Sequence, residues 1–282
     1  MSEIKLENVS FYHGKDTPYE IKALNNINVT FPCGMITGLI GHTGSGKSTL
    51  VQMFNGLLKP YEGRVLIDRE DIWSKPKDIR RVRFKVGLVM QYPEYQLFEE
   101  TIYRDIAFGP KNMGVPEDEI KDRVLEAADF AGLDRELLER SPFDLSGGQK
   151  RRAAIAGIIA MRPDILVLDE PAAGLDPRGR DSIFDNIKEY QRKSGNTVII
   201  VSHSMEDMAR LCDNLVVMAK GEILMQGNRE TVFKKADTLT SVGLDVPQIT
   251  QLVNMLKARG IAVDDGIYTV EQALAVIKNM VR

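Results

Sequence analysis

The sequence predicts an α/β fold with a mixed core sheet, an antiparallel β layer at the N-terminus, a helical subdomain and a small helical appendage at the C-terminus. One observation behind this prediction is a set of short, nearly continuous apolar runs, which are typical of parallel strands buried on both faces. These runs occupy 35–40, 86–90, 165–168 and 197–201. The second observation is the helical periodicity between them, since strands that alternate with helices indicate right-handed crossover connections.

The N-terminal layer is predicted by 4–9 (IKLENV) and 27–31 (INVTF), which alternate apolar and polar residues as half-buried antiparallel strands do. Two helices further along are predicted by apolar stripes at helical spacing. The first stripe is Ile120, Val124, Ala127 and Ala131, ending at Gly132, and the second, after Asp176, is Ile183, Phe184, Ile187 and Tyr190. A hairpin over 215–227 then closes the main domain.

Helical periodicity recurs after Gly227. The apolar positions are Ile249, Leu252, Val253 and Leu256 before Gly260, and Val270, Leu274, Ile277 and Val281 after a capping box at Thr269 and Gln272. We therefore predict a main domain at 1–230, with its helical subdomain at about 92–162, and a C-terminal helical domain at 231–282. This C-terminal domain is either a solvated tail that completes the core or a dedicated dimerisation or regulatory module.

Composition excludes several classes of protein. Apolar residues make up 43% of the chain and charged residues 27%, with a net charge of -3, which excludes a disordered chain and gives no electrostatic sign of nucleic-acid binding. Cys33 and Cys212 lack metal or redox spacing, so two reduced thiols are expected. The chain start lacks a signal-peptide pattern, and the apolar run 153–161 is far shorter than the ~20 residues that cross a bilayer. Membrane association is therefore expected only through a partner.

The stretch 41–49 (GHTGSGKST) matches G-x-x-x-x-G-K-[ST] between an apolar strand and a helix bearing Leu50, Phe54, Leu57 and Leu58. Glycines let the backbone N–H groups converge on phosphates, and the helix N-terminus adds partial positive charge. Lys47 is expected to neutralise the β- and γ-phosphates, and Ser48 to ligate Mg²⁺. The predicted nucleotide-binding residues here are Gly41, His42, Thr43, Gly44, Ser45, Gly46, Lys47, Ser48 and Thr49.

Acidic and polar side chains follow three of the predicted core strands. Asp169 and Glu170 end the strand ILVLDE, where α/β sheets bind ligands, so Asp169 is expected to hold Mg²⁺ and Glu170 to orient the attacking water. His203, after the strand at 197–201, is a candidate donor to the γ-phosphate, although a lone histidine at a strand end is more often structural. Gln91 is a candidate for both Mg²⁺ and the water, although alone it is only a surface polar residue. The predicted catalytic residues are thus Glu170, His203, Gln91 and Lys47.

A second glycine-rich turn opens another helix at 145–149 (LSGGQ), formed by Leu145, Ser146, Gly147, Gly148 and Gln149. Glycines and a serine at a helix N-terminus are again the components of an anion site. The alternative interpretation is a plain helix start, because Ser146 is a good N-cap.

The order and spacing of 41–49, Gln91, LSGGQ, ILVLDE, GLD (174–176) and His203 resemble those of the ATP-binding-cassette ATPases, over about residues 3–230. The resemblance implies a P-loop NTPase fold that binds ATP and Mg²⁺, with Ser48, Gln91 and Asp169 at the metal. It also implies two cassettes arranged head to tail, so that LSGGQ of one contacts the ATP bound by the other. Asp176 would then lie at the dimer seam, and Tyr12 or His13, in VSFYH, would stack on adenine.

Three segments narrow the resemblance to the ATPases of energy-coupling-factor (cobalt-type) importers of vitamins or transition-metal ions. They are 41–49, 92–110 (YPEYQLFEETIYRDIAFGP) and 242–261 (VGLDVPQITQLVNMLKARGI). The first and the last of these resemble the second of the two paralogous subunits of that family more than the first. The family implies a second ATPase subunit, either a paralogue or a second copy, a transmembrane coupling subunit and a substrate-binding membrane subunit. It implies a place at the cytoplasmic face of the membrane.

The acids and aromatic residues of 92–108 suit an interface with coupling helices, or else form a solvated loop. Two rival classes remain. A soluble cassette protein usually carries two cassettes or a long insertion, and neither is present. A P-loop kinase has no use for LSGGQ.

Overall fold

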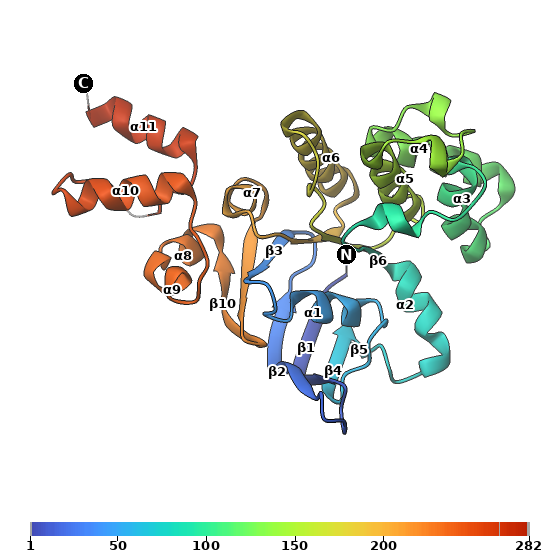
Figure 1. The fold of residues 1–282 in the computed structure, drawn as a ribbon, viewed down its shortest axis with the longest axis horizontal. Coiled ribbons are helices and arrows are strands. Elements are labelled where there is room, and N and C mark those ends of the chain that lie inside the picture. Colours follow the sequence, from blue (N-terminus) through green and yellow to red (C-terminus); the bar gives the residue numbers. More distant parts are fainter. Residues whose placement is uncertain (1, 265, 281–282) are drawn as a thin grey trace.

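The structure is a computed structural model that describes residues 2–264 and 266–280. Two sheets lie at the centre of the molecule, a group of helices covers one end, and the C-terminal helices lie at the opposite end (Figure 1). This arrangement confirms the predicted α/β fold, with a mixed core sheet and an N-terminal β layer.

The N-terminal layer is a four-stranded antiparallel sheet in the order β2-β1-β4-β5. Its strands are β1 (Ile4–His13), β2 (Ile21–Phe31), β4 (Glu62–Ile67) and β5 (Glu70–Asp71). Both strands predicted from alternation at 4–9 and 27–31 are present, and each extends beyond its alternating stretch.

The core sheet has six strands in the order β10-β9-β3-β8-β7-β6. They are β3 (Ile36–Gly41), β6 (Val86–Val89), β7 (Ile165–Asp169), β8 (Thr197–Val201), β9 (Asn214–Ala219) and β10 (Glu222–Asn228). Every pairing is parallel except that of β10 with β9, the predicted hairpin. The carboxyl ends of β3, β6, β7 and β8 therefore meet at one edge, which is where the sequence carries its polar candidates.

The helices are α1 (Lys47–Phe54), α2 (Ile79–Lys85), α3 (Ile102–Met113), α4 (Glu117–Ala131), α5 (Gly147–Ile159), α6 (Pro177–Ser194), α7 (Met205–Leu211), α8 (Arg229–Phe233), α9 (Ala236–Ser241), α10 (Gln248–Ala258) and α11 (Val270–Met280), with 3-10 turns η1 (Pro76–Asp78), η2 (Pro93–Gln96), η3 (Arg135–Leu137) and η4 (Pro142–Asp144). Within the described residues, no helix combines the length and apolar character needed to cross a bilayer. The helix predicted to carry Leu57 and Leu58 is shorter than expected. It ends at Phe54 because Gly56 takes a φ of +68°, and this leaves Leu57 exposed.

Successive residues of the core strands face opposite sides of the sheet and enter two different hydrophobic clusters. In β7, Ile165 and Val167 pack with α1 and the N-terminal sheet, whereas Leu166 and Leu168 pack with α3, α4, α5 and α6. The core sheet is therefore buried on both faces, which explains its continuous apolar runs.

The helices α3, α4 and α5 pack against one another at one end of the molecule (Figure 1). The predicted helix after Pro116 is α4, and Gly132 ends it at φ +64°. The helix predicted after Asp176 is α6. Asp176 caps its N-terminus, since its side chain accepts a hydrogen bond from Gly179 N at 2.6 Å.

The C-terminal segment divides between two clusters. Val232, Phe233, Leu239, Leu244 and Val246 join the main cluster around α3–α6, whereas α10 and α11 form a small cluster of their own around Val253, Ile267 and Ala273. The predicted capping box is present, since Gln272 Oε1 accepts from Thr269 N and Thr269 Oγ1 from Gln272 N. The predicted apolar position Val281 lies outside the described residues.

Candidate nucleotide site

The phosphate-binding loop connects β3 to α1 and is packed tightly on one side. A Cβ at Gly46, where φ is +99°, would lie 2.7 Å from the Ala23 carbonyl oxygen and 2.8 Å from Leu24 Cδ2. A Cβ at Gly44, where φ is +80°, would meet nothing within 4 Å. The loop therefore rests on β2 and leaves its other side open, as a backbone cradle for an anion requires.

This open side faces a cavity of about 940 Å³ at the carboxyl edge of the core sheet. Its lining includes thirteen residues that the sequence predicts for the site, from β1, the loop and the ends of β6, β7 and β8, together with residues that were not predicted. The predicted ones are His13, Gly41, His42, Thr43, Gly44, Gly46, Lys47, Ser48, Thr49 and Gln91, joined by Asp169, Glu170 and His203. Ser45 does not line the cavity and is fully buried beneath the loop.

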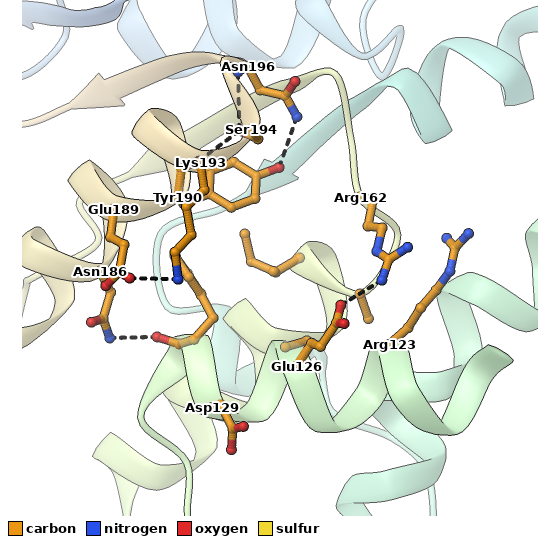
Figure 2. Close-up of a pocket in the computed structure, with 14 residues that line it drawn as sticks. Arg123, Glu126, Asp129, Arg162, Asn186, Glu189, Tyr190, Lys193, Ser194 and Asn196 are labelled. Carbon is orange, nitrogen blue, oxygen red and sulfur yellow. Dashed lines mark hydrogen bonds and ion pairs between the residues drawn. The ribbon is translucent and has the colours of Figure 1, made fainter.

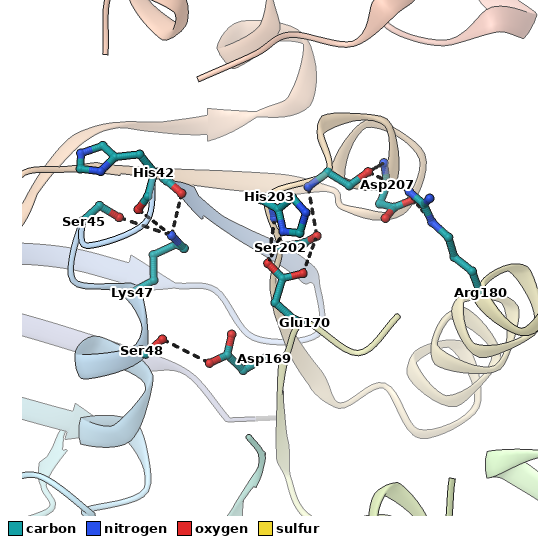
Figure 3. Close-up of polar contacts among 12 residues, drawn as sticks. His42, Ser45, Lys47, Ser48, Asp169, Glu170, Arg180, Ser202, His203 and Asp207 are labelled. Carbon is teal, nitrogen blue, oxygen red and sulfur yellow. Dashed lines mark hydrogen bonds and ion pairs between the residues drawn. The ribbon is translucent and has the colours of Figure 1, made fainter. Parts of the chain in front are cut away.

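Lys47 folds back along the loop (Figure 3). Its Nζ donates to the carbonyl oxygens of Gly41 at 2.6 Å and His42 at 3.0 Å. Burial lowers the pKa of the Lys47 ammonium, while the charges of Asp169 and Glu170 act in the opposite direction. A positive charge is thus held at the floor of the cavity, where two carboxylates and the loop converge.

Asp169 ends β7 in a buried position and accepts a hydrogen bond from Ser48 Oγ at 3.3 Å (Figure 3). Burial raises the pKa of Asp169, and the charge of Glu170 raises it further, against the Ser48 hydrogen bond and the Lys47 charge. A carboxylate and a hydroxyl at this separation are hard oxygen donors that suit Mg²⁺. Because a divalent cation would offset the burial of the Asp169 charge, these residues fit the predicted metal.

Glu170 is held by the segment that follows β8 (Figure 3). Its Oε1 accepts from His203 N at 3.1 Å and lies 2.7 Å from His203 Nδ1, and Ser202 Oγ donates to Oε2 at 3.4 Å. The structure therefore brings together the predicted water-orienting carboxylate and the predicted histidine. Sequence reasoning assigned these two residues separate partners and missed their direct contact.

Of the two aromatic candidates on β1, the structure places only His13 on the cavity wall. His13 Nε2 lies 3.2 Å from Thr49 Oγ1. Tyr12 instead packs edge-on against Tyr61, with ring centroids 6.0 Å apart, and Lys15 Nζ lies 5.4 Å from its ring centroid.

LSGGQ lies on a different cavity, of about 310 Å³, which shares no lining residue with the first. Ser146, Gly148 and Gln149 line it together with the predicted Asp176. Ser146 caps α5 in a full capping box, since its Oγ accepts from Gln149 N and Gln149 Oε1 accepts from Ser146 N at 2.9 Å. Leu145 is buried in the main cluster, and a Cβ at Gly147 would meet nothing within 4 Å. Both interpretations of LSGGQ, the cap and the anion site, are compatible with this geometry.

Sequence reasoning missed two parts of the larger cavity. Ile21, Lys22 and Ala23 of β2 and Tyr92 after β6 line it, because the fold brings them beside the loop. So do Gly243, Leu244 and Asp245, from the segment that follows α9. No local pattern marks these residues, because their place depends on contacts between distant parts of the chain.

A third cavity, of about 790 Å³, lies between α4, the end of α5 and α6 (Figure 2). Arg162 pairs with Glu126 at 2.6 Å and Lys193 with Glu189 at 2.7 Å. Asn186 Nδ2 donates to the Phe130 carbonyl oxygen across the cavity at 2.5 Å. The Asn186 hydrogen bond joins α6 to α4 of the helical subdomain, and none of the predicted site residues lies here.

Comparison with known proteins agrees with this geometry. The family model described as "ABC transporter" matches residues 24–173, and the chain therefore belongs to the ATP-binding-cassette transporter family. Within that family, it is 53% identical over 270 residues to the energy-coupling factor transporter ATP-binding protein EcfA2 of Caldanaerobacter subterraneus, covering 96% of this chain and 94% of the relative. The EcfA2 of Clostridium tetani is also 53% identical, with the same coverage. These relatives confirm the prediction of an energy-coupling-factor ATPase.

Solved structures of similar proteins support the fold. CbiO1 from Clostridium perfringens, part of the ABC transporter complex CbiONQ, is 40% identical with a TM-score of 0.74, covering 89% of this chain and 98% of that one. The cassette MJ0796, in a dimeric post-hydrolysis state bound to ADP and phosphate, is 29% identical with a TM-score of 0.73, covering 80% of this chain and 98% of that one.

Proposed function

We propose that this ATPase hydrolyses ATP held between its own phosphate-binding loop and the LSGGQ of a second cassette, and so drives uptake of a vitamin or transition-metal ion. The observation that carries the proposal is the separation of the two predicted phosphate-contacting elements onto cavities without a common residue. One chain alone cannot close both around one nucleotide. Two chains, arranged head to tail, can.

Each residue of the larger cavity then has a role in hydrolysis. The loop N–H groups and Lys47 bind the β- and γ-phosphates, and His13 lies against the adenine. Mg²⁺, when bound, supplies charge neutralisation on the phosphates, and Ser48, Asp169 and Gln91 are the residues that would hold it. Glu170 accepts a proton from the attacking water, and His203 fixes the orientation of the Glu170 carboxylate.

The cycle follows from electrostatics. The γ-phosphate attracts two helix N-termini, those of α1 in one subunit and α5 in the other, so ATP binding favours the closed dimer. Hydrolysis removes that bridge and the dimer opens. Asp176, on the LSGGQ cavity, lies at the seam between the two sites.

A membrane partner suits the surface between β6 and α3. Tyr92, Tyr95, Phe98 and Phe108 are all exposed there, with Phe98 and Phe108 stacked edge-on at 4.9 Å between centroids. Asp105 accepts from the backbone N–H groups of Phe98 and Glu99 and orders the loop. Aromatic residues with acids fit basic coupling helices of a transmembrane subunit, at the cytoplasmic face of the membrane.

The remaining partners are a second ATPase, either a paralogue or a copy of this chain, and a membrane subunit that binds the transported substrate. The domain at 231–282 would stabilise the ATPase pair. Met255, Val270 and Leu274 leave 62%, 66% and 50% of their surfaces exposed on α10 and α11, and such apolar surface favours association.

The experiment is purification of the full complex from membranes, identification of its subunits, and reconstitution in vesicles. We expect ATP hydrolysis that increases when the membrane subunits are present, together with ATP-dependent accumulation of the substrate that co-purifies. Hydrolysis that is indifferent to membrane subunits would favour a soluble cassette protein. Transfer of the γ-phosphoryl group to a metabolite would favour a kinase.

A further inference from the structure

Arg151 is a charged residue in the buried face of α5. The helix begins at the Ser146 cap, and Arg151 lies just over one turn further on, with only 5% of its surface exposed. Its neighbours on that face are apolar, among them Ala153 and Ile155. An arginine is rarely buried so deeply unless its N–H groups are all directed at specific acceptors.

The acceptors are carbonyl oxygens of the loop between β7 and α6. Nε donates to Pro171 O at 3.1 Å, Nη1 to Ala173 O at 2.5 Å, and Nη2 to Glu170 O. All three guanidinium nitrogens therefore bind the first turn of chain after the predicted catalytic carboxylate. This planar fork reaches three acceptors at once, and a lysine ammonium has no comparable geometry.

The backbone that Arg151 holds is strained. Glu170 has a φ of +53°, in the left-handed region that non-glycine residues rarely occupy. The peptide before Glu170 is also fixed, because Glu170 N donates to Val201 O at 2.9 Å. A residue in such a conformation persists only when its surroundings hold it there. The Arg151 bond to the Glu170 carbonyl is one of those restraints.

The charged groups near Arg151 include Glu94, in the turn that follows Gln91. The turn η2 packs against α5, and Glu94 in η2 has a buried Oε2 with no hydrogen-bond partner among the described residues. The charges of Glu94 and Glu170 oppose the effect of burial, which lowers the pKa of Arg151. Tyr92, the residue between Gln91 and η2, also has a positive φ, of +58°. Arg151 is thus near two residues in the left-handed conformation, Glu170 and Tyr92. Glu170 is itself a predicted water-contacting residue, and Tyr92 directly follows another, Gln91.

We propose that Arg151 is a positioning residue that fixes the Glu170 backbone through three carbonyl hydrogen bonds and, through Glu94, links it to the turn after Gln91. The proposal rests on the proposed function of Glu170 as the base. It gives a physical route by which a partner that moves η2 would change the alignment of Glu170, since the Glu170 loop is hydrogen-bonded to this guanidinium and η2 packs against α5, the helix that carries it.

The first test is steady-state ATP hydrolysis by the complex with Arg151→Lys. Because the lysine keeps the charge but cannot hold three carbonyls, we expect kcat to fall by about 10- to 100-fold, the scale of a small misplacement of a catalytic group. KM for ATP and the affinity for a fluorescent ATP analogue should stay near the wild-type values, since Arg151 does not line the nucleotide cavity. Arg135→Lys, at an exposed pair with Asp129, is the matched control and should leave kcat unchanged.

The second test separates positioning from neutralisation of Glu94. Arg151→Met leaves Glu94 as a buried carboxylate without its nearby cation, so the Tm should fall, and adding Glu94→Gln should restore much of it. We expect kcat to remain low in the double variant, because no side chain then holds the Glu170, Pro171 and Ala173 carbonyls. Recovery of kcat together with Tm would overturn the proposal and leave Arg151 as a structural counter-ion.

Different results would contradict the role of Glu170 as the base and the role of Arg151 as a positioning residue. If the wild-type complex hydrolyses ATP and Glu170→Gln abolishes this, but Arg151→Lys retains the wild-type kcat, only the positioning role is wrong. If Glu170→Gln retains hydrolysis, the proposed base is wrong and the role of Arg151 loses its target.

Discussion

Glu170 is restrained on both its backbone and its side chain. His203 and Ser202 bind its carboxylate oxygens, while Arg151 and Val201 bind its carbonyl and N–H groups. The carboxylate is therefore held in one orientation, and this would reduce the reorganisation that the proposed hydrolysis step requires. A residue with these restraints is expected to act through its charge.

Replacing Glu170 by Gln removes that charge and keeps the shape of the side chain. We expect kcat for ATP hydrolysis to fall by about 100- to 10,000-fold, the usual contribution of a general base. ATP binding should persist, so the ATP-bound dimer should accumulate and be visible by size-exclusion chromatography with ATP and Mg²⁺.

The matched control for this prediction is Glu189→Gln. Glu189 is an exposed carboxylate that pairs with Lys193 on the surface of α6, and its loss should leave both hydrolysis and dimerisation unchanged. Normal turnover by Glu170→Gln would show that another group accepts the proton.

At the scale of single elements, α5 has the best-defined start of the helices around the site. Ser146 and Gln149 exchange side-chain and backbone hydrogen bonds in a capping box, and the same serine lines the LSGGQ cavity. One residue therefore begins the helix and presents a hydroxyl to the second cavity.

Ser146→Ala should lower the free energy of unfolding by about 1 kcal/mol, the usual cost of losing a serine cap. The measurement is denaturant unfolding without nucleotide. Ser241→Ala, which removes an exposed hydroxyl that bonds Thr238 O, should change the same quantity by less than about 0.5 kcal/mol. Equal effects from both substitutions would mean that the capping box contributes nothing particular to α5.

Individual elements show which features could be predicted from the sequence and which could not. The strand predicted at 197–201 is β8, with the same bounds. Its bounds could be predicted because a parallel strand buried on both faces consists of contiguous apolar residues. The predicted end of α1 was wrong. Gly56 takes a left-handed conformation after the helix ends, whereas Leu57 and Leu58 continue the apolar pattern in the sequence. The motifs at 41–49 and 165–170 gave ten of the 22 residues that line the larger cavity. Arg151 and Asp245 were missed because burial and proximity arise only when distant segments pack.

On the scale of the whole molecule, the hydrophobic clusters give the predicted boundary at 230 a specific test. Five large apolar side chains between Val232 and Val246 belong to the main cluster, whereas α10 and α11 share a small cluster of their own. The segment after 230 is therefore attached to the core in its first part and largely self-contained in its second.

A chain ending at residue 247 should fold, with a Tm close to that of the full chain. A chain ending at 230 should not, because burial of each large apolar side chain contributes roughly 1.5–3 kcal/mol. The loss of five such contributions is comparable to the whole stability of a domain, about 5–15 kcal/mol. Thermal melts followed by circular dichroism distinguish the two chains, and a cooperative native melt of the shorter one would support a domain boundary at 230.

The segment between α9 and α10 contacts two parts of the molecule. It lines the larger cavity with Gly243, Leu244 and Asp245, and it leads into α10, where Gln248 N donates to Glu206. By thermodynamic linkage, binding at the cavity and binding at the C-terminal helices then change each other's affinity equally. If a protein that binds the C-terminal helices raises the affinity for ATP by some factor, then ATP must raise the affinity of that protein for the helices by the same factor.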